Sequence, residues 1–283
     1  MNNRATPNIS IIIVNWNTKE LLRTCLSSIG ATVNTTHETI IVDNNSDDGS
    51  AEMVEASFPE TSLIRAGRNL GFAAANNLGI NKASGRYVLL LNPDCELLPG
   101  SIDTMIEYAD RNPDIAVIGP KLLNSDGTLQ KNGRIFPTFA REFLHITRLY
   151  RLLPGYFNRR LEWGRQDFDI PADVDEVSGA CMLVRESMIA QVGGLDERFF
   201  MYYEEVDWCK RIKAHGGRVF YLPEAQVVHH HSQSAGKIGI EKNRLAYESQ
   251  YLYFLKHHGR AQAVTLRAIS NAILFVKGAG ARR

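Results

Sequence analysis

The sequence predicts an α/β fold, in which helices flank a mainly parallel β-sheet and a helical extension follows toward the C-terminal end. Three observations support this prediction. β-branched runs alternate with helical patterns up to about residue 120. Several of these runs are apolar almost throughout, as expected for strands that helices cover on both faces. From about residue 241 onward the pattern is helical alone.

The first part of the chain contains the alternating elements. Strands are expected at residues 9–14, 39–42, 62–64 and 87–91, and helices at about 19–29, 50–58, 72–83 and 100–111. Alternation of this kind gives right-handed crossovers, so these strands should run parallel.

The middle of the chain is less regular. Residues 123–175 are rich in arginine and aromatic side chains and show no clear period, which is typical of a long functional loop with a mobile part. We interpret this segment as an acceptor-side loop. Regular structure should resume with a strand at 176–184, a short helix to 191, a helix at 204–215 that ends at Gly216, and a strand at 218–222.

Composition excludes several classes of protein. The 283 residues carry a net charge of +1, which gives no sign of nucleic-acid binding by bulk charge. The four cysteines form no CxxC pair, which argues against a zinc ribbon or a secreted disulfide framework and suits a reducing cytoplasm. We also expect no signal peptide and no transmembrane helix.

Polar clusters follow the first four expected strands. Asn, Asp and Gly dominate plain turns, so any one cluster has an ordinary structural explanation. Four clusters on the same edge of one sheet favour a ligand site instead, because ligands bind at the carboxyl ends of parallel strands. The clusters occupy residues 15–17, 43–49, 68–72 and 92–94.

Two carboxylates in these clusters suggest specific contacts. Asp43 ends a strand and could accept a hydrogen bond from the N3–H group of a uracil or thymine ring, although an Asx turn explains it as well. Asp94 follows Pro93 after a buried strand, where a carboxylate suits Mg²⁺ or Mn²⁺ held between protein and diphosphate.

Three consecutive histidines begin at His229. Adjacent side chains of an extended chain alternate sides, so only His229 and His231 could share one side. A solvated turn explains the triplet equally well. Beside a phosphate and metal site, one imidazole would become a metal ligand or a diphosphate donor.

The run FFMYYEEVDWCKR places three acids at a helix start, where acids are favoured in any case. Helical spacing puts Glu204, Asp207 and Arg211 on one stripe, so the two acids should have Arg211 as a charge partner. Glu205 heads the more apolar face with Trp208, which would raise its pKa and favour a general base. We assign Glu204, Asp207 and Trp208 to the acceptor side.

The order of these motifs resembles the inverting family 2 glycosyltransferases of the GT-A fold, a Rossmann-like α/β architecture, and within them the rhamnosyltransferase-like branch. The resemblance covers about residues 10–234. It rests on VNWN, IIVDNNSDDGS, NLGFAAANNLGI, GRYVLLLNPDCEL, VSGACMLVR, GLDERFFMYYEEVDWCKR and VVHHHSQS.

The resemblance implies a division of the chain and a set of roles. Residues 1–120 would be the nucleotide-binding half and 121–240 the acceptor-binding and catalytic half of one domain, followed by the extension at 241–283. Asp94 and His229 would bind Mg²⁺ or Mn²⁺, with Asn92 replacing the first acid of the family's DXD motif, and Glu205 would be the catalytic base. The donor and nucleotide would contact Asn15, Asn17, Asp43, Asn45, Asn69, Gly71, Asn76, Asn92 and Gly179.

The implied reaction is a single inverting displacement. Glu205 would deprotonate an acceptor hydroxyl as it attacks the anomeric carbon of a nucleoside-diphosphate sugar. dTDP-L-rhamnose is the first choice of donor, with other dTDP- or UDP-hexoses as alternatives. The acceptor would be a glycan or a polyprenyl-linked precursor of a surface polysaccharide or of the cell wall.

Other functions remain as alternatives. A nucleotidyltransferase would need a glycine-rich phosphate loop after the first strand, where the sequence has VNWNTKELL. A sugar-nucleotide-binding scaffold would not need Glu205, and a zinc module would hold stoichiometric zinc at the histidines. The C-terminal stretch mixes apolar residues with Arg267 and Lys277, so it could lie on the inner face of the plasma membrane, pack on the domain, or bind a second subunit as a homodimer.

Overall fold

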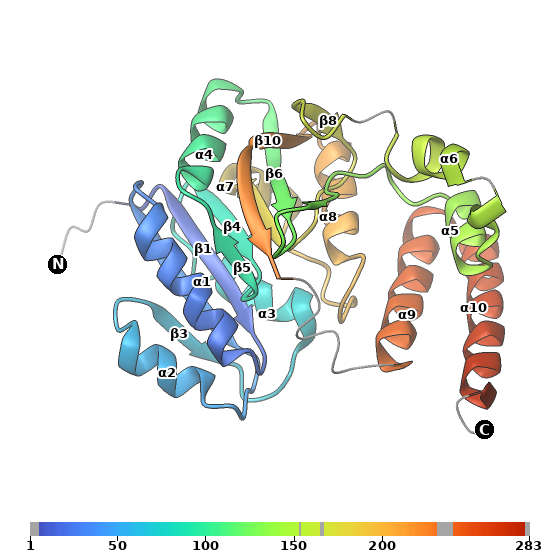
Figure 1. Ribbon diagram of the computed structural model, residues 1–283, viewed down its shortest axis with the longest axis horizontal. Helices are drawn as coiled ribbons and strands as arrows, with labels where there is room; N and C mark the ends of the chain where they lie inside the picture. The colour runs from blue at the N-terminus through green and yellow to red at the C-terminus, as the bar shows by residue number, and fades with distance from the viewer. Residues whose placement is uncertain (1–5, 153, 165–166, 231–239, 281–283) are drawn as a thin grey trace.

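A computed structural model of the chain describes residues 6–152, 154–164, 167–230 and 240–280. A long sheet runs through the centre, helices cover both of its faces, and a pair of C-terminal helices stands to one side (Figure 1). The predicted α/β architecture with a helical extension is confirmed. His230 is described, but His231 and the residues up to 239 lie outside the described part of the chain.

The first four long strands form a parallel half-sheet in the order β3-β2-β1-β4. The near-complete burial of β1, β2 and β4 agrees with the apolar runs that predicted them, whereas β3 at the edge is only partly buried. Their bounds are β1 Ile9–Asn15, β2 His37–Asp43, β3 Ser62–Arg65 and β4 Tyr87–Leu91.

The second half of the sheet is mixed rather than mainly parallel. Strand β9 pairs antiparallel with β4 on one side and with β6 on the other, and β10 then runs parallel to β6. The long connection between β6 and β9 brings the chain back in the opposite direction. The bounds are β5 Cys95–Leu97, β6 Ile115–Leu123, β7 Leu129–Gln130, β8 Ala172–Val174, β9 Cys181–Arg185 and β10 Arg218–His229.

Helices bury both faces of the sheet in two hydrophobic clusters. One cluster joins the sheet to α1, α2 and α4, and the other joins it to α3, α7 and α8. The helices of this domain are α1 Lys19–Thr32, α2 Ser50–Ser57, α3 Gly71–Ile80, α4 Ser101–Arg111, α7 Glu186–Val192 and α8 Glu204–Ala214. The helix predicted at 204–215 is therefore confirmed.

The segment expected to be irregular contains helices. These are α5 Phe139–Ile146, a 3-10 turn at Leu149–Leu152, α6 Pro154–Phe157 and a π-helical turn at Asn158–Glu162. Thr138 caps α5 by accepting a hydrogen bond from Arg141 N at 3.2 Å, and one face of α5 is apolar. The prediction missed these short helices because no long period marks them.

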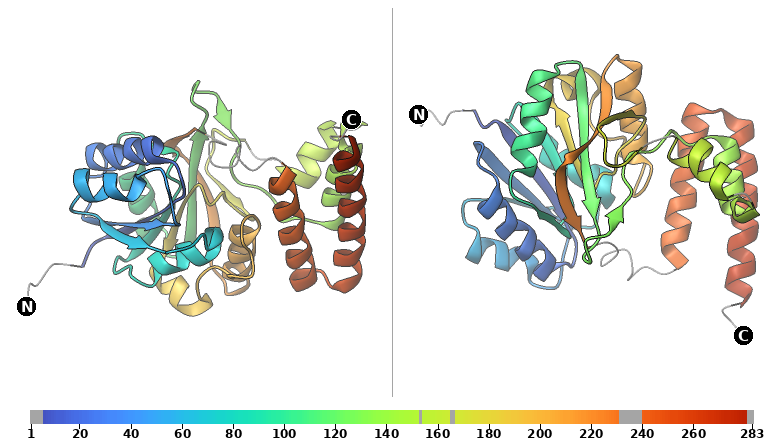
Figure 2. Two further views of the ribbon diagram at one scale, coloured as in Figure 1. Left: turned by 90° about the horizontal axis from the view of Figure 1, so that it is seen from below. Right: turned by 45° about the horizontal axis from the view of Figure 1, so that its top comes forward.

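The extension is a pair of helices, α9 Ile240–His257 and α10 Arg260–Gly280, joined at a turn with Gly259 at φ 89°. A third hydrophobic cluster unites both helices with α5 and with the chain before α8; its buried members are Ile146, Phe199, Val206, Tyr253, Phe254, Ala263 and Leu266. Figure 2 shows the pair beside the sheet domain with α5 against α10. Packing on the domain, one of the three alternatives for this segment, is therefore observed.

Among the described helices, none has the length and hydropathy that a membrane crossing requires.

Candidate active site

A pocket opens at the carboxyl ends of β1, β2 and β4, where the polar clusters follow the strands. Residues from both halves of the chain line it, so the two halves meet at this site. The lining residues are Val14, Trp16, Asn44, Asn69, Gly71, Phe72, Asn92, Pro93, Asp94, Ser178, Gly179, Ala180, Met201, Tyr202, Glu204, Glu205, His229 and Lys242.

One wall of the pocket holds the predicted pair of metal ligands. Asp94 follows β4 and His229 ends β10, and both side chains are buried. His229 Nε2 lies 3.3 Å from Asp94 Oδ1. The sequence places these residues far apart, and the sheet brings them together.

The donor set fits a hard or borderline divalent cation. His229 Nδ1 lies 2.6 Å from Gln130 Oε1, which can accept its hydrogen and fix the ring. Nε2 then faces a carboxylate oxygen, and either a proton or a divalent cation between the two atoms satisfies this contact. Cys95 Sγ lies within 4.8 Å of the same atoms but directs its thiol to Ala180 O.

The pocket is also lined by two neighbouring acids at the first turn of α8. Tyr202 and Tyr203, which precede them, have φ of 72° and 68°, a region that bulky residues rarely adopt. Strain of this kind persists only where the surroundings enforce it, and it is common at functional sites. The strained tyrosines direct Glu204 and Glu205 into the pocket.

Glu205 has the environment of a general base. It is partly buried, and its Oε2 is shielded from solvent without a hydrogen-bond partner among the described residues. Burial raises the pKa of Glu205, and the positive charge of Arg134 offsets part of that rise. Gly179 lies opposite, where an added Cβ would be 3.7 Å from Glu205 Cβ.

Glu204 departs from the prediction. It is the more buried of the two acids, at 4% exposure, and no ion pair with Arg211 forms. Burial first, and then the charge of Glu205, raise the pKa of Glu204 well above its ordinary value. The predicted charge pairing of Glu204 with Arg211 fails because the Arg211 guanidinium, two turns along the helix, contacts Asp207 instead.

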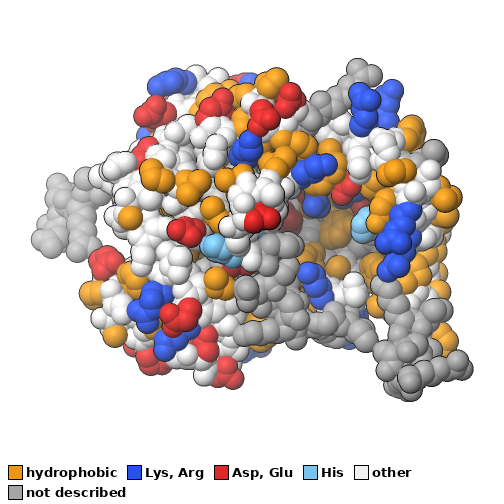
Figure 3. Space-filling view, viewed as in Figure 1, with side chains coloured by type: hydrophobic (Ala, Val, Ile, Leu, Met, Phe, Trp, Pro, Cys, Tyr) orange, Lys and Arg blue, Asp and Glu red, His pale blue; other side chains and the backbone are white. Residues whose placement is uncertain are grey.

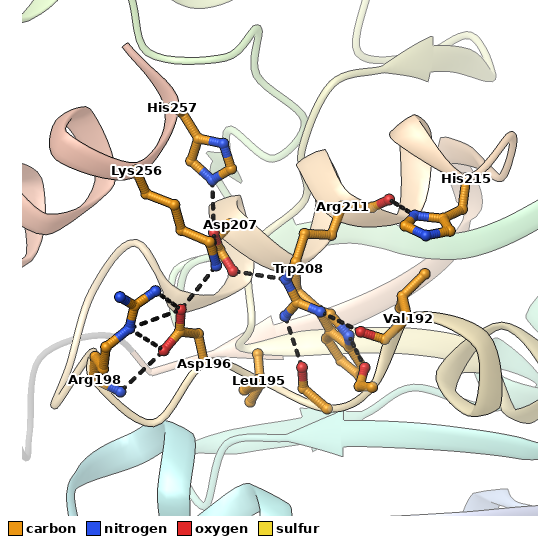
Figure 4. A network of polar contacts seen from close by, with 12 residues as sticks. Val192, Leu195, Asp196, Arg198, Asp207, Trp208, Arg211, His215, Lys256 and His257 are labelled. Carbon is orange, nitrogen blue, oxygen red and sulfur yellow. Dashed lines mark hydrogen bonds and ion pairs between the residues drawn. The ribbon is translucent and has the colours of Figure 1, made fainter. Parts of the chain in front are cut away.

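The structure does not bring Asp207 and Trp208 to the pocket, which corrects their assignment to the acceptor side. Both are fully buried. Trp208 donates from Nε1 to Gly193 O at 2.8 Å (Figure 4). Helical spacing alone could not show that the sheet cluster encloses Trp208 and that α9 covers Asp207.

Asp207 is the centre of an ion network. Its carboxylate contacts Arg211 Nε at 2.8 Å, Lys256 Nζ at 2.8 Å and His257 Nε2 at 2.6 Å (Figure 4). Lys256 also reaches Asp196 at 2.8 Å. The network holds the end of α9 against α8. Asp207 therefore stabilises the helix that carries Glu204 and Glu205 without lining the pocket itself.

On the nucleotide side, Asn15 and Asp43 shape the loop after β2. Both are buried; Asn15 Nδ2 donates to Ser46 Oγ at 3.0 Å and lies 3.4 Å from Asp43 Oδ1. Neither lines the pocket, so the contact of Asp43 with a nucleobase stays a prediction. Asn17 accepts a hydrogen bond from Asp47 N at 2.8 Å, and Asn45 has φ 67° in the same loop.

Asn76 is also away from the pocket. It is buried inside α3, where Nδ2 donates to Phe72 O at 2.9 Å. In contrast, Asn69, Gly71, Asn92 and Gly179 line the pocket as expected. Gly71 has φ 80°, and a Cβ there would meet Phe200 O at 2.3 Å, so this position requires glycine.

Several lining residues were not assigned individual roles. Asn44 fixes the wall by donating from Nδ2 to Asn69 Oδ1 at 3.0 Å and by accepting from Leu70 N at 2.8 Å. Trp16 and Asn44 belong to the polar clusters at residues 15–17 and 43–49, which position after a strand had indicated. Lys242 comes from α9, and no sequence signal connects it to this pocket.

Comparisons with known proteins agree with the site. Residues 10–193 match the family model described as Glycosyl transferase family 2. The N-acetylglucosaminyl-diphospho-decaprenol L-rhamnosyltransferase of Mycobacterium tuberculosis is 30% identical over 88% of this chain and 85% of its own length. The rhamnosyltransferase WbbL of Escherichia coli K12 is 25% identical over 78% of this chain and 83% of its own length.

Solved structures show the same fold. GalNAc-T7, whose crystal structure contains UDP, GalNAc and Mn²⁺, superposes with a TM-score of 0.62 at 15% identity. The match covers 95% of this chain, which spans 55% of the length of that chain. At this identity the likeness concerns the GT-A architecture. With a family match over most of its length, rhamnosyltransferases among its relatives, and this fold, the chain belongs to the family 2 glycosyltransferases.

Proposed function

We propose that the protein transfers L-rhamnose from dTDP-L-rhamnose, with inversion, to a hydroxyl of a lipid-linked glycan. One observation supports this most strongly: a partly buried base candidate, Glu205, lines the same pocket as the Asp94–His229 pair. A single displacement uses a base on the acceptor hydroxyl and a cation at the leaving diphosphate of the donor, and one pocket holds residues for both. Other dTDP- and UDP-hexoses are the alternative donors.

Glu205 provides the general base of the reaction. Its carboxylate lines the pocket and can accept the proton of the acceptor hydroxyl as that oxygen attacks the anomeric carbon. The bond from the anomeric carbon to the diphosphate breaks in the same step, so the configuration inverts and no covalent intermediate with the enzyme forms.

Asp94 and His229 would hold Mg²⁺ or Mn²⁺, which supplies charge neutralisation for the leaving diphosphate when it is bound. Gln130 orients the His229 ring for this task. Only one carboxylate of the motif contributes, because Asn92 replaces the other acid. Asn92 still lines the pocket and can donate a hydrogen bond to a phosphate oxygen.

The acceptor assignment follows the relatives. The mycobacterial relative is named for N-acetylglucosaminyl-diphospho-decaprenol, so we propose a sugar on a polyprenyl diphosphate as acceptor. With such an acceptor, the enzyme would act on the cytoplasmic side, at the inner face of the plasma membrane.

A surface near α6 suits contact with an anionic membrane. Lys and Arg side chains gather over the helical part of the molecule, whereas acidic and basic side chains alternate over the sheet domain (Figure 3). The stretch from Arg148 to Arg160 exposes Leu152 at 76% and Tyr156 at 59% among its arginines. In α10, Phe275 is 78% exposed. Flotation with anionic liposomes tests this contact, and a protein that stays at the bottom of the gradient contradicts it.

A donor and acceptor matrix tests the function. Purified protein with Mn²⁺ is incubated with dTDP-L-rhamnose, UDP-hexoses or neither, and with a short-chain N-acetylglucosaminyl-diphospho-lipid. We expect transfer from dTDP-L-rhamnose, loss on chelation, and an anomeric configuration opposite to that of the donor by NMR. Transfer of a UDP-hexose alone, or retention of configuration, contradicts the proposal.

A further inference from the structure

Glu204 combines burial, isolation and a position on the pocket wall. It is 4% exposed, and its Oε2 has no hydrogen-bond partner among the described residues. Asp207, three residues along the same helix, is equally buried but contacts Arg211, Lys256 and His257. The same helix thus carries one fully paired acid and one acid for which the described residues provide no ion pair.

A carboxylate in the position of Glu204 would be unstable. Removing a charge from water is costly unless a counterion or hydrogen bonds replace the water. Among the described residues Glu204 has no ion pair and its Oε2 has no hydrogen-bond partner, and a hydrogen bond from the Glu204 backbone offsets only part of the cost. The adjacent Glu205 adds repulsion, because two carboxylates in one pocket do not ionise together readily. Glu204 therefore holds a proton at neutral pH.

A protonated carboxyl group presents an O–H donor. Buried donors without an acceptor are rare in folded proteins, so this one calls for an explanation. Oε2 of Glu204 is shielded, and the side chain forms part of the wall around the substrate pocket. An oxygen atom of a bound sugar is the acceptor that such a donor fits.

We propose that Glu204 is a neutral carboxylic acid that donates a hydrogen bond to a sugar oxygen in the pocket, while Glu205 alone ionises and accepts the proton. This inference rests on the proposed function, because it takes the pocket to be the sugar site. The two neighbouring acids would have different roles because their surroundings give them different protonation states. The sugar oxygen belongs to the donor or to the acceptor, and the experiment separates the two.

Three substitutions of Glu204 test the proposal. Glu204→Gln keeps a neutral hydrogen-bond donor of the same shape, so we expect kcat/KM within about threefold of the wild type. Glu204→Ala and Glu204→Met remove the donor, so we expect kcat/KM to fall about 10- to 100-fold. Glu204→Met fills the space and should raise Tm, because a buried polar group without a partner is lost.

Glu205→Gln is the matched control, since the same change one residue along should abolish transfer. A Glu204→Gln variant as inactive as Glu205→Gln, with an unchanged circular dichroism spectrum, overturns the proposal. So does full kcat/KM in the folded Glu204→Met variant. A rise in donor Kd, measured by calorimetry without acceptor, assigns the contact to the donor sugar; a rise in acceptor KM alone assigns it to the acceptor.

Infrared spectroscopy gives a readout that needs no activity. At neutral pH the carboxylic acid C=O band should be weaker in Glu204→Gln than in the wild type, and Glu205→Gln should leave that contribution in place. An unchanged band in Glu204→Gln overturns the protonated state. If the wild type transfers no sugar while the band behaves as expected, the proposed function fails and the assignment of the proton stands.

Discussion

The Ser249 hydroxyl donates a hydrogen bond of 2.7 Å to the carbonyl oxygen of Met201, and this bond ties helix α9 to the loop before the two pocket acids. A second tie lies next to it. Gln250 Nε2 and the Tyr203 hydroxyl both donate to Glu142 Oε2, at 2.6 Å and 3.0 Å. The extension and α5 therefore hold the strained residues Tyr202 and Tyr203 in place.

Removing the hydrogen bond from Ser249 to Met201 should lower both the free energy of unfolding and kcat. Ser249→Ala leaves the Met201 carbonyl without this donor, which should cost about 1 kcal/mol of unfolding free energy. Small shifts of the base reduce the rate, so we expect kcat to fall about 3- to 10-fold. Denaturant titration and steady-state kinetics measure the two effects.

Ser270 provides the matched control. It is 1% exposed on α10, and its Oγ has no hydrogen-bond partner among the described residues. Ser270→Ala should therefore leave kcat unchanged and leave the stability equal or higher. Equal loss of activity in both serine variants would refute a specific role for the bond to Met201.

The Asp207 network should make the free energy of unfolding depend on pH in the acidic range. Although burial alone would raise it, hydrogen bonds from His257, Lys256 and Arg211 lower the pKa of Asp207 to about 2. An unfolded aspartate has a pKa of about 3.9, so the network stabilises the fold above that pH and loses its effect as pH falls toward 2.

Asp207→Asn should remove this contribution, leaving Arg211 without its ion-pair partner and Lys256 with Asp196 alone. We expect a loss of about 3–5 kcal/mol at neutral pH, as for a buried ion pair deprived of one partner, and a flatter acid limb of the stability curve. Asp110→Asn breaks an exposed pair with Arg86 and should cost about 1 kcal/mol or less. Equal losses in the two variants would contradict a special role for Asp207.

The pH profile reports the state of Glu205. The base must be ionised to act, and burial raises its pKa, so kcat/KM should decline with falling pH at a value above about 4.3, the ordinary glutamate pKa. The charge of Arg134 lowers the pKa of Glu205. Arg134→Gln should therefore move the acid limb to higher pH, and Arg134→Lys should restore it. A move to lower pH in Arg134→Gln would be incompatible with this electrostatic account.

Metal affinity should depend on one histidine of the pair His229–His230. His229→Ala should weaken Mn²⁺ binding, measured by titration with dTDP present, by roughly tenfold or more. His230 Nε2 faces Glu96 at 3.3 Å, on the other side of the strand, so His230→Ala should leave the affinity nearly unchanged. Similar losses in both variants would remove His229 from the metal site.

The sequence was sufficient for the parallel half of the sheet but not for the rest. Strands β1 to β4 are apolar runs separated by helical patterns, and local pattern determines both their type and their direction. Strand β9 was also expected, yet its antiparallel direction depends on how the segment from β6 returns to the sheet. Within that segment α5 packs against α10, a contact between distant parts of the sequence that no local pattern encodes.

The candidate active site was likewise predictable from the sequence only in part. Position after a strand identified Asp94, Asn69 and Asn92, because the carboxyl ends of the strands define one edge. Helical spacing separated Glu205 from its neighbours but could not reveal which sides of α8 are covered. Glu204 and Asp207 were both expected near the acceptor. Glu204 lines the pocket and forms no ion pair with a described residue, whereas Asp207 is held by α9.

The central claim is that Glu205 removes the proton of the acceptor, and Glu205→Gln tests it most directly. The variant keeps the shape of the pocket, so calorimetry should give a donor Kd close to that of the wild type. Transfer measured with the same donor and acceptor should fall about 10²- to 10⁴-fold, the usual contribution of a general base. Undiminished transfer in a variant that binds the donor normally would contradict the account.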